Sequence, residues 1–266
     1  MGRSGYYEYV ARQKGRRLDP EELRLRSRVQ AIHAETGQSY GSRRMAKQLQ
    51  DEGFAVGRYK ARRLMKEVGV SVKRRMRRQP QTTDSRHGYG VAPNLLARRF
   101  DVDRANAAWC GDITYLWTEE GWLYLSVLLD LYSRKVVGWA MSDRIDSNLV
   151  TDALKMALGR RHPAQGLIHH SDRGSQYAAH AYRGLLADNG IRCSMSRKGD
   201  CLDNAVAERF FGSLKREWTA NRFYATHQEA RDDVIDYIER FYNSRRKHSY
   251  LGYVSPNEYE KIAQVA

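Results

Sequence analysis

Apolar residues recur at helical spacing in three short segments near the N-terminus. The first begins at Asp19, whose side chain can cap a helix, followed by Pro20 in the first turn. The segments are separated by glycine-containing turns, where helices commonly end. The predicted helices cover about residues 19–35, 41–53 and 57–69. Three short helices joined by tight turns favour a helix-turn-helix region, which we assign to residues 1–70.

Beyond Ala108 the pattern changes to β-strands. Short apolar and aromatic runs predict strands over residues 109–117, 122–131, 135–141, 167–170 and 192–195. Helical spacing predicts helices over residues 147–160, 178–189 and 203–218, a long one after the capping box of Thr226 and Glu229, and a short one near residues 256–262. The first three strands have short links and should form an antiparallel meander. This order of elements predicts an RNase H-like α/β domain with a mixed sheet.

Composition divides the chain into four parts. Residues 71–105 lack apolar periodicity and are rich in basic side chains, so we interpret them as a basic linker; the basic residues are Lys73, Arg74, Arg75, Arg77 and Arg78. Residues 106–225 form the predicted mixed-sheet core, and residues 226–266 a C-terminal helix and tail. The predicted fold class is α/β: an RNase H-like core with an N-terminal all-α helix-turn-helix domain and a C-terminal helical tail.

The net charge is concentrated in the first hundred residues. The whole chain has 46 Lys and Arg against 31 Asp and Glu, a formal charge of +15. Residues 1–100 hold 24 basic and 9 acidic residues, and residues 101–266 hold 22 of each. This asymmetry indicates that the N-terminal part binds a polyanion such as DNA, while the rest has a different task.

Composition also narrows the cellular setting. A hydrophobic content of 41% fits a globular protein, and no apolar run reaches the roughly 18–20 residues of a membrane span. The first residues lack the apolar segment of a secretory signal. The three cysteines, Cys110, Cys193 and Cys201, form no CxxC pair, which favours reduced thiols over disulfides or a zinc site. We therefore expect a cytoplasmic protein with no membrane partner.

The third predicted helix carries a basic outer face. Arg58, Arg62, Arg63 and Lys66 lie on it, with Tyr59 among them. Arginine and lysine serve both phosphate contact and guanine recognition, so two interpretations remain open. The helix either reads base edges in the major groove or contacts phosphates alone. A basic linker could also lie along the DNA backbone, and each neutralised phosphate would steepen the log–log salt dependence by about 0.9.

Three acidic residues in the predicted core are candidates for chemistry. Asp112 lies inside a strand among apolar and aromatic residues, where aspartate is disfavoured. Asp172 follows a short apolar strand, where the carboxyl end of the strand meets a loop. Glu208 lies in the first turns of a helix capped by Asp203 or Asn204, away from its apolar stripe. Each alone also fits a structural role, as a loop contact, a turn residue or a solvated helix charge.

An RNase H-like plan brings these three carboxylates together, because its first and fourth strands are neighbours and the helix after the fifth packs beside them. At about 4 Å and an effective dielectric near 20, each ionised pair would cost about 4 kcal/mol. Such a cluster needs a cation, and oxygen ligands without His or Cys favour Mg²⁺ or Mn²⁺. Two ions about 3.5–4 Å apart would suit an in-line displacement at phosphorus. We therefore predict Asp112, Asp172 and Glu208 as metal ligands and catalytic residues.

Spacing and flanking motifs make a family resemblance specific. Between Asp172 and Glu208 lie 35 residues, and Lys215 follows Glu208 by seven. The flanking motifs are Trp109-x-x-Asp112-Ile-Thr-Tyr, His169-His170-Ser171-Asp172-Arg-Gly-Ser-Gln-Tyr177, Asp203-Asn204-Ala-x-Ala-Glu208, Tyr242-Asn243-x-x-Arg246-x-His248 and Ser255-Pro256. Over residues 20–262 the chain resembles the second-frame (OrfB) transposase of the bacterial insertion-sequence-three family, which belongs to the DDE transposases and retroviral-type integrases.

The resemblance implies an enzyme that binds the terminal repeats of an insertion element, cleaves DNA by metal-dependent hydrolysis and joins the freed 3′-OH to target DNA. Asp112, Asp172 and Glu208 would hold two Mg²⁺ or Mn²⁺ ions, and Lys215 would contact a DNA phosphate. His170 and Asn204 match motif positions without an assigned role. Joining two DNA ends implies at least a homodimer, acting in the bacterial cytoplasm at the nucleoid.

Alternative interpretations remain for the partner of this protein and for the reaction that it catalyses. The chain has no leucine-zipper heptads and no His/Cys zinc module. It therefore either works with a separate first-frame (OrfA) protein or is the catalytic portion of a frameshift fusion. An RNase H-like nuclease that only hydrolyses would share the acidic site, but the 35-residue spacing and Lys215 argue against it. A non-enzymatic DNA-binding regulator of transposition would have no need for three clustered carboxylates.

Overall fold

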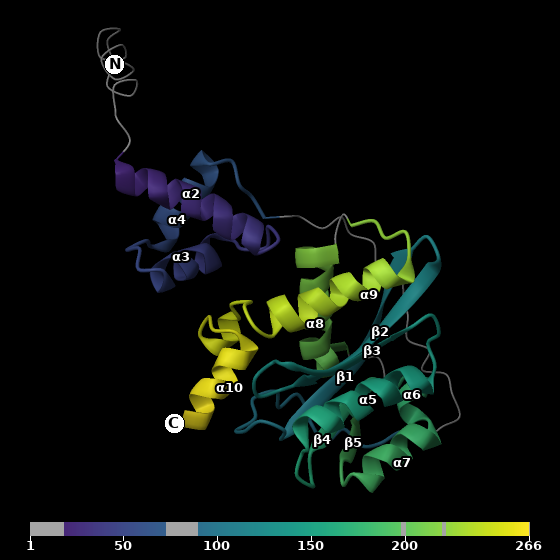
Figure 1. Ribbon diagram of the computed structural model, residues 1–266. Helices are drawn as coiled ribbons and strands as arrows, with labels where there is room; N and C mark the ends of the chain where they lie inside the picture. Colours follow the sequence, from purple (N-terminus) through teal and green to yellow (C-terminus); the bar gives the residue numbers. More distant parts are fainter. Residues whose placement is uncertain (1–18, 73–89, 198–200, 220–221, 266) are drawn as a thin grey trace, which may run out of the picture. The chain divides into compact units, whose positions relative to one another are not determined.

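The computed structural model describes residues 19–72, 90–197, 201–219 and 222–265, except for the side chains of residues 201 and 202. The chain divides into two compact units, Met1–Lys73 and Arg74–Ala266. The described part of the first unit is helical, and the second is built on a β-sheet (Figure 1).

The first unit contains the three predicted helices, α2 (Pro20–Glu35), α3 (Ser42–Asp51) and α4 (Arg58–Glu67). Asp19 caps α2, because its Oδ1 accepts a hydrogen bond from the Glu21 amide at 3.1 Å. The apolar positions that repeat at helical spacing form a shared core, made by Leu25, Val29, Ile32, Met45, Leu49, Ala61 and Leu64. Burial of this face of α4 leaves its basic residues on the surface.

Five strands form one mixed sheet in the second unit. β1 (Ala108–Thr118), β2 (Gly121–Asp130) and β3 (Val136–Ser142) make the antiparallel meander, and β4 (Ile168–Ser171) and β5 (Arg192–Met195) run parallel to β1. The order across the sheet is β3-β2-β1-β4-β5. The predicted fold class is confirmed, including the neighbouring positions of the first and fourth strands.

One layer of helices covers one face of this sheet. α5 (Ser147–Arg161) packs on β2 and β3, and α6 (Ser175–Ala178) and α7 (His180–Asp188) follow beside it (Figure 1). α7 confirms the helix predicted over residues 178–189 except at its start, because Ala178 ends α6 and the chain is extended at Ala179. The break lets Tyr177 and Tyr182 both pack on His169, whereas a continuous helix would hold them about 140° apart.

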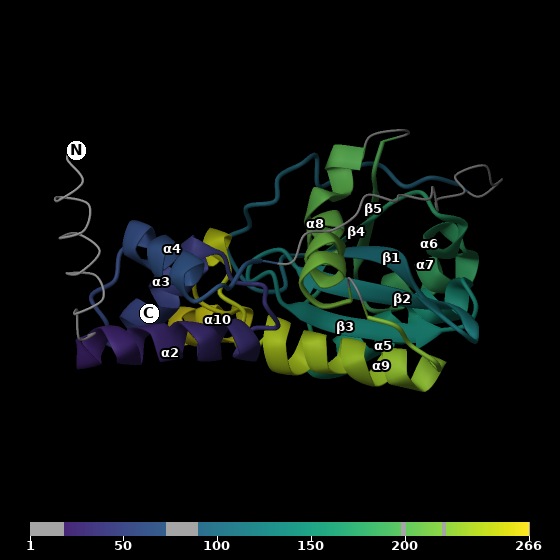
Figure 2. The ribbon, with the colours of Figure 1, turned by 90° about the horizontal axis from the view of Figure 1, so that it is seen from above.

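The opposite face carries α8 (Ala205–Leu214) and α9 (His227–Ile235), seen from a second side in Figure 2. The predicted helix over residues 203–218 consists of three pieces: a 3₁₀ turn, Cys201–Asn204, then α8, then a π-helical segment, η2 (Lys215–Thr219). α9 likewise continues into a π-helical segment, η3 (Asp236–Tyr242). Thr226 caps α9 as predicted, since its hydroxyl accepts from the Glu229 amide at 3.1 Å.

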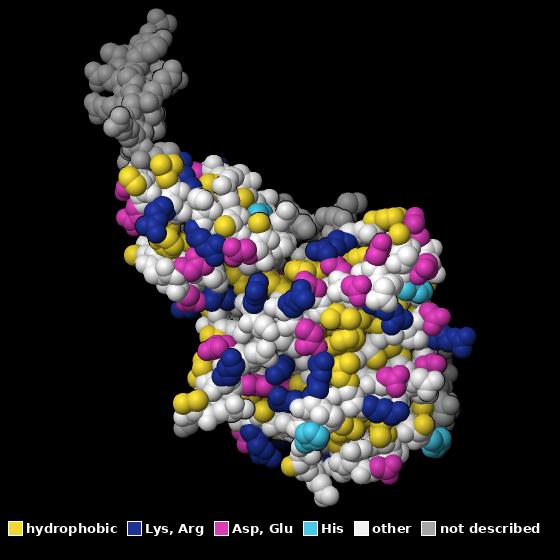
Figure 3. All heavy atoms as spheres, viewed as in Figure 1, with side chains coloured by type: hydrophobic (Ala, Val, Ile, Leu, Met, Phe, Trp, Pro, Cys, Tyr) yellow, Lys and Arg dark blue, Asp and Glu magenta, His cyan; other side chains and the backbone are white. Residues whose placement is uncertain are grey.

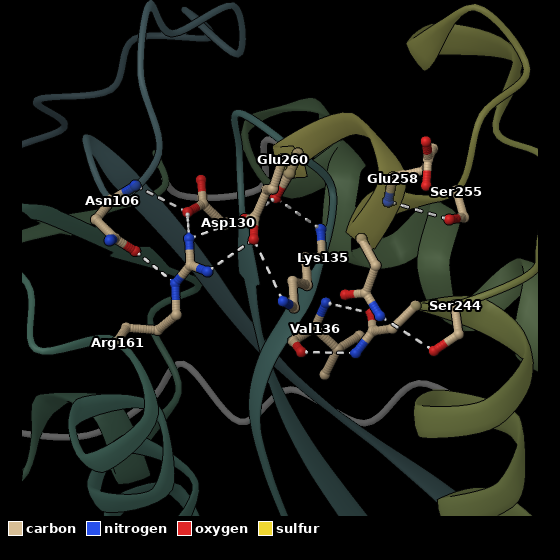
Figure 4. A network of polar contacts seen from close by, with 12 residues as sticks. Asn106, Asp130, Lys135, Val136, Arg161, Ser244, Ser255, Glu258 and Glu260 are labelled. Atoms are coloured by element: carbon tan, nitrogen blue, oxygen red, sulfur yellow. Dashed lines mark hydrogen bonds and ion pairs between the residues drawn. The ribbon is translucent and has the colours of Figure 1, made fainter. Parts of the chain in front are cut away.

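The C-terminal tail contains a 3₁₀ turn, η4 (Ser249–Leu251), and α10 (Pro256–Val265), and polar side chains fix it to the sheet (Figure 4). Asn243 pairs with both backbone groups of Val136 on the edge strand: its Oδ1 accepts and its Nδ2 donates, each at 3.0 Å. From α10, Glu260 accepts two hydrogen bonds of 2.8 Å from Arg161. The side-chain amide of Asn243 thereby covers part of the sheet edge that β3 forms.

The surface of the second unit differs from that of a uniformly basic protein. Basic and acidic side chains are interspersed over the face seen in Figure 3, as expected from the equal numbers of the two in residues 101–266. No helix in the described part of the chain is long and apolar enough to cross a membrane. Cys110 and Cys193 are free thiols, and the side chain of Cys201 lies outside the described residues.

Candidate active site

The first two candidate carboxylates lie at equivalent positions of neighbouring parallel strands. Cys110 on β1 and His170 on β4 are register partners, and Asp112 and Asp172 each follow two residues later. Side chains two residues apart along a strand point to the same face. Parallel pairing therefore brings both aspartates to the same level of the sheet, although β4 itself ends at Ser171.

Burial and neighbouring charges change the pKa of the Asp112 carboxyl. Its Oδ1 accepts a hydrogen bond from the Ile113 amide at 2.8 Å. Burial raises the pKa of Asp112 well above its usual value, and the negative charges of Asp172 and Glu208 raise it further. Asp112 therefore lies close enough to Asp172 and to Glu208 to interact electrostatically with each, and a cation would relieve the cost of ionising Asp112 here.

A tight turn sets the position of Asp172. Its Oδ1 accepts a hydrogen bond from the Gly174 amide at 2.9 Å. A Cβ atom at residue 174 would lie 3.0 Å from the same oxygen, so the turn favours glycine. The half-buried Asp172 carboxyl is thus held at the end of β4 on the side of Asp112.

Glu208 lies on the exposed side of the first turns of α8. Partial burial around the carboxyl nevertheless raises its pKa. Asn204, the residue before α8, donates from Nδ2 to the carbonyl of Gly111 at 3.2 Å. Because Gly111 directly precedes Asp112, this hydrogen bond ties the start of the Glu208 helix to the strand that carries the first aspartate.

The predicted capping role of residues 203 and 204 is wrong. Asn204 occupies the N-cap position of α8, but its side chain makes no capping hydrogen bond because the amide points to β1. Asp203 is fully buried and accepts hydrogen bonds from Asn94 Nδ2, Arg98 Nε and the Arg197 amide at 2.9–3.0 Å. Its carboxylate therefore fixes the preceding loops instead of the helix end.

The three candidate carboxylates do not lie together as a complete metal-binding site in this structure. Within the described ranges, no three His, Cys, Asp or Glu side chains lie close enough together to hold one ion. The set of donors nevertheless suits a hard divalent cation, since all are carboxylates and no His or Cys joins them.

Lys215 lies beside this site. Its Nζ is 4.4 Å from the centroid of the Tyr115 ring, and its positive charge acts to lower the pKa of Asp112. Tyr115 follows Asp112 by three residues on β1. Lys215 is the first residue of the π-helical segment η2, so it is placed where a phosphate bound at the carboxylates would find a cation.

A buried ion pair holds the helix segment that carries Lys215. Nε and Nη2 of Arg246 donate to the two carboxylate oxygens of Glu217 at 2.5 and 2.7 Å. Both residues are 3% exposed. The sequence singled out Arg246 as a motif residue, but Glu217 was missed, because a glutamate near a helix end usually marks the surface. The pair links the tail motif to the Glu208 helix.

The two histidines beside Asp172 have structural environments. His170 is buried, with Nδ1 2.8 Å from Ser194 Oγ and Nε2 3.2 Å from Ser196 Oγ. His169 Nε2 lies 3.0 Å from the Tyr182 hydroxyl. Burial lowers the pKa of His170 to about 4 and that of His169 to about 3. Both rings are therefore neutral at physiological pH and hold the strand end in place.

The candidate DNA-binding residues fall into two groups. Arg58, Arg62, Arg63 and Lys66 are exposed on α4, and Tyr59 among them is 82% exposed. The basic residues of the predicted linker, Lys73, Arg74, Arg75, Arg77 and Arg78, lie outside the described residues. The four side chains of α4 are thus accessible to a polyanion.

Comparison with protein families assigns both units. The family described as "Integrase core domain" matches residues 102–201 and again residues 189–256, and the family described as "HTH-like domain" matches residues 20–79. The first covers β1 with Asp112 and β4 with Asp172 directly after it, the second covers α8 with Glu208, and the third covers α2 to α4.

The chain is also similar to individual proteins over nearly its full length. It is 43% identical to the insertion element IS600 uncharacterized 31 kDa protein of Shigella sonnei, covering 100% of this chain and 97% of that protein. It is 38% identical to transposase InsF for insertion sequence IS3A of Escherichia coli, covering 98% and 90%. A solved structure of a simian T-cell lymphotropic virus intasome in complex with PP2A regulatory subunit B56 gamma aligns with a TM-score of 0.49 at 15% identity, covering 86% of this chain and 73% of that one.

Proposed function

The chain belongs to the IS3 family of transposases, and we propose that Asp112, Asp172 and Glu208 are the residues with which it cleaves and joins DNA. The enzyme is a DNA transposase with an integrase core. The observation that supports the assignment of the site is the parallel register of β1 and β4, which brings Asp112 and Asp172 to the same level of the sheet, together with the hydrogen bond from Asn204 at the start of the Glu208 helix to Gly111 beside Asp112.

The integrase core family is metal-dependent, and the three carboxylates fit Mg²⁺ or Mn²⁺. We propose that they hold two such ions. When bound, the ions would make the attacking oxygen more nucleophilic and stabilise the leaving oxygen. The strongly raised pKa of Asp112 supports this, because a buried carboxylate beside two others ionises readily only next to a positive charge.

The protein's own residues then position the DNA. In the cleavage step, water attacks a phosphorus atom and the bond to the 3′ oxygen breaks, which releases a 3′-OH. In the joining step, this 3′-OH attacks a phosphorus of target DNA and replaces another 3′ oxygen. Lys215 would contact a phosphate beside the carboxylates, and the Asn204 bond to Gly111 keeps Glu208 near Asp112 in both steps.

The helical unit supplies DNA binding. We propose that α4 lies against the DNA of the element ends with Arg58, Arg62, Arg63 and Lys66, and that the basic residues between positions 73 and 78 extend this contact along the backbone. The same protein would act on target DNA in the bacterial cytoplasm, at the nucleoid. Holding two element ends together requires at least two copies of the chain, working with a first-frame (OrfA) protein or as part of a fusion.

The experiment that tests this function follows DNA joining directly. Fragments bound from a random DNA pool are sequenced, and the selected fragments are then incubated with the protein, Mg²⁺ and a target plasmid. We expect products in which a fragment 3′ end is covalently joined to plasmid DNA. Cleavage without joined products would identify a nuclease, and binding without either product would identify a regulator.

A further inference from the structure

Residues 94–98, called the 94–98 turn below, have a backbone conformation that their side chains disfavour. Ala97 and Arg98 are both left-handed, with φ of 46° and 62°, which costs about 1–3 kcal/mol for each residue other than glycine. Asn94 Oδ1 accepts a hydrogen bond from the Ala97 amide at 2.8 Å, and Leu96 is 3% exposed. Such a backbone persists only where its surroundings hold it, so the contacts of this turn with the core determine its shape.

One contact of the 94–98 turn is with Asp203, a fully buried carboxylate. Its Oδ1 accepts a hydrogen bond from Arg98 Nε at 3.0 Å. Its Oδ2 accepts one from Asn94 Nδ2 and one from the Arg197 amide, each at 2.9 Å. Asp203 precedes Glu208 by five residues. The carboxylate therefore ties both the turn and the chain after β5 to the start of the helix that carries Glu208.

A second contact leads from the turn to the strand end that carries Asp172. Ser194 Oγ on β5 accepts hydrogen bonds from the Leu95 and Leu96 amides at 2.9 and 3.3 Å. Both lone pairs of this hydroxyl are thus used, so its hydrogen is left for Nδ1 of His170, 2.8 Å away. Because His170 precedes Asp172 by two residues, the same turn is also fastened to the end of β4.

We propose that Asp203 is a positioning residue for the reaction at the three carboxylates. Through the 94–98 turn it holds the start of α8, with Glu208, at a fixed separation from the end of β4, with Asp172. A carboxylate suits this role because both of its oxygens accept, whereas an amide would direct an N–H group against one of the three donors. This inference rests on the proposed function and adds the residue that sets the distance between two of its acids.

A buried carboxylate with several donors also stabilises the fold, and Glu260 on α10 provides a comparison for that effect. Glu260 is 9% exposed and accepts hydrogen bonds from Ser133 Oγ, Lys135 Nζ and Arg161. α10 carries none of the three candidate acids. Loss of either carboxylate should therefore reduce stability, but only the loss of Asp203 should alter the site.

The test compares variants of the full chain by three measurements: Mn²⁺ binding, followed by electron paramagnetic resonance of the free ion, DNA joining with Mg²⁺ at saturating DNA, and unfolding in urea. We expect Asp203→Asn to weaken Mn²⁺ binding and to slow joining, each about tenfold, as is typical for residues that orient metal ligands. Affinity for DNA should not change. Glu260→Gln, the matched control, should lose stability but keep the Mn²⁺ affinity and joining rate of wild type.

Asn94→Ala separates positioning from charge. It removes one donor to Asp203 and no charge, so a loss of Mn²⁺ affinity in this variant has no electrostatic origin. We expect a loss in the same direction as in Asp203→Asn. An effect of Asp203→Asn without one of Asn94→Ala would assign the effect to charge and overturn the inference. If Asp203→Asn does not fold, wild-type Mn²⁺ affinity in folded Asn94→Ala overturns it.

Two further outcomes complete the test. Losses in Asp203→Asn no larger than those in Glu260→Gln would show a purely structural role and overturn the inference. Asp172→Asn, measured alongside, separates the two proposals. If it weakens Mn²⁺ binding and Asp203→Asn does not, this inference alone is contradicted. If it leaves Mn²⁺ binding unchanged, the proposed function is contradicted, and this inference with it.

Discussion

Asp112 and Asp172 each lie two residues beyond a register pair of the parallel strands β1 and β4, formed by Cys110 and His170. A parallel pair of strands thus delivers two carboxylates to the same level and face of the sheet. The third carboxylate, Glu208, comes from α8, whose start is hydrogen-bonded to Gly111 next to Asp112. Any change that shifts these elements relative to one another should therefore alter the site without touching its acids.

Gly138 on β3 provides one such change. A Cβ atom there would lie 2.3 Å from the Ala153 carbonyl oxygen and 2.7 Å from the Ala157 Cβ, both on α5. Gly138→Ala should destabilise the second unit by about 1–3 kcal/mol, because backbone must move to admit the methyl group. Urea unfolding followed by circular dichroism measures the loss.

Gly212→Ala is the matched control, since no atom lies within 4 Å of the added Cβ. Gly212 is inside α8, where alanine is preferred over glycine by about 0.5–1 kcal/mol. We expect unchanged or slightly increased stability. A Gly138→Ala protein as stable as Gly212→Ala would contradict the tight packing of β3 against α5.

Removing one partner of the buried Arg246–Glu217 ion pair should destabilise the protein more than replacing both partners. Arg246→Ala leaves the Glu217 carboxylate buried and unpaired, which should cost about 3–5 kcal/mol. Replacing both residues by methionine should recover most of this loss, because two apolar side chains need no partner. Unfolding free energies of Arg246→Met, Glu217→Met and the double variant give the coupling. Additive losses would show that the two side chains do not depend on each other.

The sequence alone indicated the candidate acidic residues, but it did not indicate the residues that hold their strands and helix in place. Asp112, Asp172 and Glu208 could be chosen as candidates because acids stand out beside apolar strands and because their spacing matches a family. The roles of Asn204 and Glu217 were not found, since one makes a contact across 93 residues and the other is paired across 29. Local patterns carry no information on such contacts. The short helix α6 and the extended residue Ala179 after it were also missed, because they serve the packing of two tyrosines on His169 and not a local preference.

His169 should make stability depend on pH. Its pKa is lowered by burial from 6.5 in the unfolded chain to about 3. Below pH 6.5 the unfolded chain binds a proton that the folded protein does not, so stability is complete above pH 6.5 and falls as the pH drops toward 3. Between pH 7 and 5 this group alone should cost about 2 kcal/mol.

His169→Gln tests this directly. The glutamine side chain does not titrate, so the variant should lose about 2 kcal/mol less than wild type between pH 7 and 5, even if it is less stable at pH 7. Urea midpoints at the two pH values provide the comparison. An identical pH dependence in the two proteins would rule out His169 as its source.

Substitution of Arg62 on α4 distinguishes the two interpretations of how the helical unit binds DNA, by phosphate contact alone or by base recognition. If it contacts only phosphate, Arg62→Ala should weaken binding to all sequences alike and reduce the log–log salt slope by about 0.9. If it reads a base, the variant should lose about 1–3 kcal/mol on the selected sequence and tolerate changes at one position. Binding titrations at several salt concentrations, on selected and scrambled DNA, separate the two. No effect on either DNA would exclude Arg62 from the interface.

The central claim, that the acidic triad performs strand transfer, is tested most directly by Asp172→Asn. The amide keeps the size of the side chain but removes a charge needed to hold a divalent cation. Strand transfer with Mg²⁺ and DNA binding are measured together for wild type, Asp172→Asn and Asp152→Asn, which changes an exposed acid on α5. We predict that Asp172→Asn abolishes joining while binding DNA nearly as well as wild type, and that Asp152→Asn joins normally; undiminished joining by Asp172→Asn would contradict the assignment of the site.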